Sequence, residues 1–112
     1  MSLQDEWARD PSIRSMRRLF SRMEAIQEDL LRRSNLPPFG GSLRSLREEA
    51  RSLFERAWVL SAKANPRMEE EELARLYAHC FLRVLRLKGI EVPSDVFEED
   101  ERLTKWVDEG LR

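Results

Sequence analysis

Apolar residues recur every three or four positions along almost the whole chain, and this spacing constrains the fold more than any other feature of the sequence. Residues at that period share one face of an α-helix. The sequence has no sustained alternation of apolar and polar residues, so we expect no β-sheet. A chain of 112 residues with 41% hydrophobic residues has room for one core. We therefore predict an all-α fold: a single domain over residues 1–112 that resembles a four-helix bundle, with a short N-terminal helical arm.

Proline, glycine and capping residues divide the periodic stretches into helices. Asp10 and Asn65 each precede a proline, as an N-cap precedes the first helical position. Gly89 supplies a helix stop, and paired prolines and glycines over residues 37–41 indicate a loop. The expected helices span approximately residues 11–34, 42–64, 66–88 and 95–110, preceded by an arm over residues 2–9. Because the third helix is apolar around most of its girth, we expect it to lie at the centre.

Cysteine content and the N-terminal sequence indicate where the protein resides. Cys80 is the only cysteine, so no internal disulfide can form and a reducing compartment fits best. The first ten residues lack the apolar core of a secretory signal. The apolar runs are far shorter than the roughly 20 residues that span a bilayer. We expect a cytoplasmic protein that does not associate with membranes.

Histidine and cysteine do not form a recognisable metal site in this sequence. His79 and Cys80 are adjacent, so on a helix their side chains point about 100° apart and cannot share an ion. There is no second histidine. We expect His79 at the surface or boundary of its helix, Cys80 in the core, and no metal ligands from either.

Two rows of cationic residues are candidate binding surfaces. Arg75, His79 and Arg83 share one helix face and could bind an anion such as a nucleotide, although a solvent-facing stripe with Arg75 paired to Glu71 is the simpler interpretation. The second row lies on the first helix and could contact nucleic-acid phosphates, or be an ordinary solvated face. It consists of Arg14, Arg17, Arg18 and Arg22.

Aromatic residues outside the main apolar stripes predict an interface. Phe54 and Trp58 form a second apolar row on the second helix, and Trp7 lies on the N-terminal arm. This is more apolar surface than such a small bundle needs, so we expect these residues to be buried in a homodimer or against another protein.

Paired carboxylates give the sequence a family resemblance. Leu46-Arg47-Glu48-Glu49-Ala50-Arg51-Ser52-Leu53, followed by Glu71-Glu72-Leu73-Ala74-Arg75-Leu76, resembles the MazG-like all-α nucleotide pyrophosphatases. That family has an E-E-x-x-E helix before an E-E-x-x-D helix, which runs on to a Gly-Ile pair like Gly89-Ile90 here. The resemblance covers approximately residues 36–103. It implies a helical bundle in which carboxylates on neighbouring helices hold Mg²⁺, a cation that prefers oxygen ligands.

The chain departs from this family at two of the four expected ligand positions. Ser52 replaces the third acid of the first motif, and Arg75 replaces the aspartate of the second. If the resemblance holds, the chain is a degenerate relative that kept the bundle and lost the metal-dependent hydrolysis.

Three hypotheses for function follow from the sequence. The first is a non-catalytic helical-bundle subunit or protein-interaction module without a cofactor, possibly a degenerate MazG-like protein. The second is an active nucleoside triphosphate pyrophosphatase that uses Mg²⁺ with Glu48, Glu49 and Glu72. The third is an accessory protein that binds nucleic acid through the arginines of the first helix.

Overall fold

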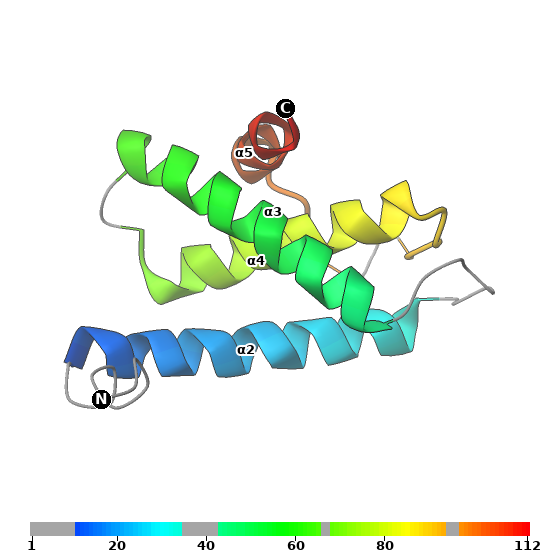
Figure 1. Cartoon of the computed structure of the whole chain (residues 1–112), viewed down its shortest axis with the longest axis horizontal. Helices are drawn as coiled ribbons and strands as arrows, with labels where there is room; N and C mark the ends of the chain where they lie inside the picture. Colours follow the sequence, from blue (N-terminus) through cyan, green and yellow to red (C-terminus); the bar gives the residue numbers. More distant parts are fainter. Residues whose placement is uncertain (1–10, 35–42, 66–67, 94–96) are drawn as a thin grey trace.

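The computed structural model describes residues 11–34, 43–65, 68–93 and 97–112, and it confirms the all-α fold (Figure 1). Within these ranges the chain forms four helices and no β-strand. They are α2 (Pro11–Arg33), α3 (Leu43–Ala64), α4 (Glu70–Leu87) and α5 (Glu101–Leu111). The bounds of α2 and α3 lie within a residue of the ranges predicted from the apolar period. The predicted arm over residues 2–9 lies outside the described residues.

Helix α4 is the central element of the bundle. It packs against α2, α3 and α5, and in Figure 1 α2 and α5 lie on opposite sides of the crossed α3–α4 pair. Its buried residues lie on nearly all sides of the helix, as the apolar residues around most of its circumference predict. They are Leu73, Ala74, Leu76, Tyr77, Ala78, His79, Cys80, Phe81, Leu82, Val84 and Leu85.

The start of α4 differs from the sequence prediction. The proline pattern predicts a start at residue 66, whereas the helix begins at Glu70. Glu69 has an extended backbone and its side chain makes no capping hydrogen bond. Three acids follow in the first turn, where their charge is favourable to the helix dipole. The end agrees with prediction: Gly89 has a positive φ of 74°, and Ile90 N–H donates to the Leu85 carbonyl at 3.0 Å. This is a Schellman-type stop that only glycine adopts without strain.

The last helix begins later than expected. The predicted range starts at residue 95, but residues 97–100 are not helical and α5 begins at Glu101. Asp100 is the N-cap, and its carboxylate accepts a hydrogen bond from Arg102 N–H at 2.9 Å. The segment Phe97–Asp100 instead crosses α4, where the Phe97 ring lies 5.0 Å from the His79 ring. No helix in the described part of the chain is long and apolar enough to cross a bilayer.

Two leucines near the end of α4 test how much of the stability depends on burial of this helix. Leu85 is fully buried, whereas Leu87 is 63% exposed. We expect Leu85→Ala to lower the free energy of unfolding by about 2–5 kcal/mol, because it removes core contacts and leaves a cavity. Leu87→Ala should change it by less than about 0.5 kcal/mol. Urea denaturation followed by circular dichroism measures both, and equal effects would contradict a core centred on α4.

Candidate functional site

The three acidic residues predicted for catalysis do not converge. Glu48 accepts a hydrogen bond from Arg44 Nε at 3.2 Å, and the Glu49 carboxylate lies 3.0 Å from Lys88 Nζ. The Glu72 carboxylate lies 3.6 Å from a guanidinium nitrogen of Arg102. Each acid thus faces a different cation. Among the described residues no three His, Cys, Asp or Glu side chains are grouped so that they could hold a metal ion.

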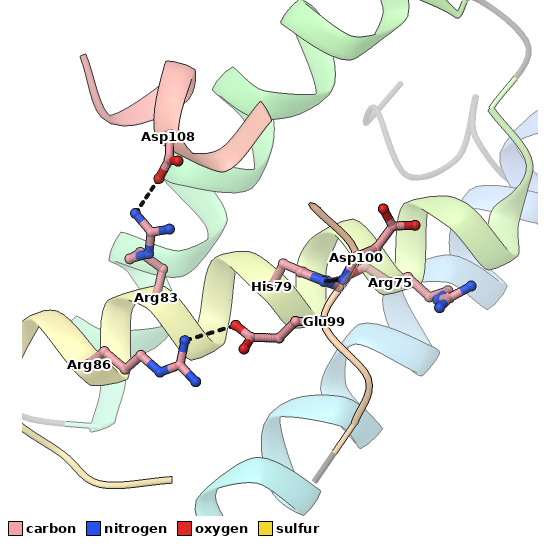
Figure 2. Close-up of polar contacts among 7 residues, drawn as sticks. All are labelled: Arg75, His79, Arg83, Arg86, Glu99, Asp100 and Asp108. Atoms are coloured by element: carbon pink, nitrogen blue, oxygen red, sulfur yellow. Dashed lines mark hydrogen bonds and ion pairs between the residues drawn. The ribbon is translucent and has the colours of Figure 1, made fainter. Parts of the chain in front are cut away.

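His79 is buried, contrary to the expectation that it lies at the surface or boundary of its helix. Only 4% of the residue is exposed, and both ring nitrogens are engaged (Figure 2). Nε2 accepts a hydrogen bond from Asp100 N–H at 2.9 Å, and Nδ1 lies 2.6 Å from the Arg75 carbonyl oxygen. Because a backbone N–H can only donate, Nε2 carries no proton and Nδ1 donates to Arg75. His79 therefore joins the segment before α5 to the central helix.

The proposed anion-binding row of Arg75, His79 and Arg83 is divided by these contacts. Arg83 pairs with Asp108 of α5, and the neighbouring Arg86 pairs with Glu99 at 2.8 Å (Figure 2). Arg75 is exposed, but Glu71, its expected partner, pairs with Arg22 instead. The ring of His79 has no nitrogen left for a ligand.

The arginine row of the first helix is only partly open. Arg17 and Arg18 are exposed on α2. Arg22 forms an ion pair with Glu71 of α4 at 2.7 Å, and this hydrogen bond lowers the pKa of the Glu71 carboxyl below its usual range. The side chain of Arg14 lies outside the described residues. Of the three arginines of this row whose side chains the structure describes, Arg17 and Arg18 are available to a polyanion.

The aromatic residues predicted at an interface belong largely to the core of the chain itself. Phe54 is 2% exposed, and its ring lies 5.4 Å from those of Tyr77 and Trp58. Trp58 is half-buried against the same core. Trp7 lies outside the described residues. Phe54 was expected to need a partner chain, but helix α4 already covers it.

Cys80 lies in the core, as expected. Burial raises the pKa of its thiol to about 12, so the unreactive thiol form predominates at neutral pH.

An apolar opening in the described surface lies between α3 and α5, and the sequence analysis did not predict it. This α3–α5 groove, of about 440 Å³, is lined on α3 by Glu55, Arg56, Val59 and Leu60. Glu109, Gly110 and Arg112 line its other side. The side chain of Val59 is 60% exposed there, and that of Leu111, at the end of α5, is 40% exposed.

Gly110 sets the depth of this groove by letting the two helices approach closely. A Cβ atom at Gly110 would lie 3.2 Å from Leu53 Cδ1 and 3.4 Å from the Ala57 nitrogen. Arg56 also spans the two helices, and its Nε donates to the Gly110 carbonyl at 2.8 Å. That bond satisfies a carbonyl of the last turn that has no partner within the helix. A glycine late in an amphipathic helix was the one sequence signal of this contact.

Fold and site together define an all-α bundle with an exposed apolar groove and dispersed carboxylates. Comparison with known proteins found no matching family model, no similar curated protein and no similar solved structure.

The buried His79 predicts a pH dependence of stability. Burial lowers the pKa of the ring below its ordinary value of 6.5, although the Arg75 carbonyl, Glu99 and Asp100 act in the opposite direction. The unfolded chain therefore binds a proton more readily than the folded one. The stability contributed by neutral His79 should be complete above about pH 6.5 and decrease as the pH falls below that value.

Urea midpoints measured between pH 7.5 and pH 5.5 test this expectation. His79→Gln keeps an acceptor and a donor but cannot titrate, so its midpoint should change less over this range than that of the original chain. Parallel pH profiles for the two proteins would contradict the role assigned to His79.

Proposed function

We propose that this chain is a non-catalytic helical-bundle subunit that binds a second copy of itself through the α3–α5 groove. The exposed apolar side chains at this groove carry the proposal, Val59 above all. An apolar side chain exposed beside an apolar groove is favourably buried by a partner surface. The hypothesis that Phe54 and Trp58 form the interface is thereby replaced by one that uses the neighbouring face of α3, where Val59 lies beside the end of α5.

The charges around the groove favour a second copy as the partner. Two acids, Glu55 and Glu109, and two arginines, Arg56 and Arg112, surround the apolar residues. A two-fold symmetric interface brings the same patch of both subunits together, so the patch must be complementary to itself. Equal numbers of acids and bases around an apolar centre meet this requirement, whereas a partner of one charge sign would face repulsion from half of them.

The positions of the carboxylates favour a non-catalytic role over the pyrophosphatase hypothesis. Glu48, Glu49 and Glu72 face three different cations, and exposed Arg75 and Ser52 occupy the positions of the missing acids. A degenerate MazG-like origin stays a proposal that rests on the motif resemblance alone. Residence in the cytoplasm, supported by a single cysteine that is buried as a thiol, is likewise a proposal.

The proposed dimer can be tested by measuring mass in solution. Light scattering after size-exclusion chromatography should give about twice the chain mass of 13.3 kDa. Val59→Asp should give a monomer with an unchanged circular-dichroism spectrum, because a carboxylate cannot be buried unpaired in the groove. Leu43→Asp is the matched control, since Leu43 is exposed at the other end of α3, outside the groove. A monomer at chain concentrations up to about 1 mM would overturn the proposal.

A further inference from the structure

A second groove separates α2 from α3, and it differs in character from the apolar one. The two helices both pack on α4, but they are not a closely packed pair themselves. The α2–α3 groove between them, of about 440 Å³, is lined on α2 by Glu24, Gln27 and Glu28. Arg44, Arg47, Glu48 and Arg51 line it on α3. Its size is in the range of small-molecule sites, and every residue that lines it is polar or charged.

Opposite charges lie on the two walls of this groove. Glu24 and Glu28 give the α2 wall a charge of −2, while three arginines and Glu48 give the α3 wall +2. Glu48 pairs with Arg44 along its own helix. The guanidinium of Arg51 lies 5.1 Å from the centre of the Phe20 ring. No ion pair among the described residues joins the two walls, so each wall presents its charge to the space between them.

Gln27 carries a buried, unpartnered acceptor in the wall of this groove. The residue lines the groove but is only 4% exposed, and its Oε1 has no hydrogen-bond partner. Buried amide oxygens in folded proteins almost always have a partner, since an unsatisfied one destabilises the fold. An unsatisfied glutamine oxygen in the wall of a groove is therefore a candidate partner for a group that arrives from outside and donates a hydrogen bond.

The hydroxyl of Tyr77 is a second buried polar group without a partner. Tyr77 comes from α4, the helix on which both walls pack. Burial raises the pKa of this hydroxyl, and among the charges that act on it are those of Arg51, Arg47 and Glu24, which all line the groove. The only two buried side-chain polar atoms that lack partners in the described residues thus belong to one region of the molecule.

We propose that the α2–α3 groove binds a small zwitterion carrying an ammonium and a carboxylate group, as free amino acids and short peptides do. The ammonium would lie against Glu24 and Glu28 and, with the Gln27 amide turned toward the groove, donate to Gln27 Oε1. The carboxylate would lie against Arg47 and Arg51. A ligand with both charges gains from both walls, whereas a purely anionic ligand such as inorganic phosphate is attracted by the arginines but repelled by the acids of the same groove. This site is independent of the proposed dimer, because it uses neither α5 nor the C-terminal half of α3.

Titrations followed by NMR of the ¹⁵N-labelled chain test the proposal. The side-chain amide of Gln27 reports directly on the site. Glycine, alanine, serine and leucine represent free amino acids, and alanyl-leucine represents peptides. Comparing their affinities shows which of the two classes of ligand the groove prefers. We expect at least one of these zwitterions to shift the Gln27 amide signal. N-acetyl-leucine and leucinamide each lack one charge and should bind at least about tenfold more weakly than leucine. No shift with any zwitterion at about 10 mM, or equal binding of the blocked forms, would overturn the proposal.

Gln27→Met separates a ligand-binding role from a structural one. Methionine has nearly the same shape but lacks the unsatisfied acceptor, so we expect a higher melting temperature without ligand and an affinity reduced by about tenfold. Arg18→Gln is the matched control on the same helix, because Arg18 is exposed and does not line the groove. It should leave affinity unchanged. A lower melting temperature with unchanged affinity in Gln27→Met would show that Gln27 serves only the fold, and would overturn the proposal.

Discussion

The burial of α4 on all sides is the constraint on which the rest of the structure depends. Because α2, α3 and α5 all pack against this one helix, α4 joins α2 to the rest of the bundle, whereas α3 and α5 also pack directly on each other. The aromatic contacts follow the same pattern, since Tyr77 of α4 meets Phe54 of α3 edge-on at 5.4 Å. Two helices that both pack on the same central helix need not pack closely on each other. The polar groove between α2 and α3 exists for that reason, and its two walls can carry charges that would be costly in a closed interface.

Polar contacts then determine how the last part of the chain is attached. His79 is buried in α4, and it uses both ring nitrogens to connect the Arg75 carbonyl with the backbone of Asp100. The ion pairs of Arg83 with Asp108 and of Arg86 with Glu99 lie beside it on the same helix (Figure 2). A row of residues that resembles an anion site in the sequence is therefore an internal connection between α4 and the segment that leads into α5.

Sequence periodicity was sufficient to predict the helices but not their environment. The 3–4 spacing of apolar residues determined the all-α class, the central place of α4 and nearly the bounds of α2 and α3. The start of α5 was predicted too early, because the extended segment before it depends on the distant His79 and not on local propensity. His79 and Phe54 were misplaced because their surroundings also come from residues distant in the sequence. His79 was expected near the surface, and Phe54 was assigned to a partner although α4 covers it. Neither groove could be predicted, since each depends on the distance between two helices far apart in the sequence.

The close contact at Gly110 has a consequence for motion within the bundle. An isolated helix of 11 residues is marginal in water, so α5 is helical only while it is docked on α3 and α4. Such a segment opens as one cooperative unit, and its amide protons exchange with solvent through that local event and not through global unfolding. The α3–α5 groove exists only in the docked state. Anything that occupies the groove therefore holds α5 in place, and the population of the opened form becomes a function of the concentration of whatever binds there.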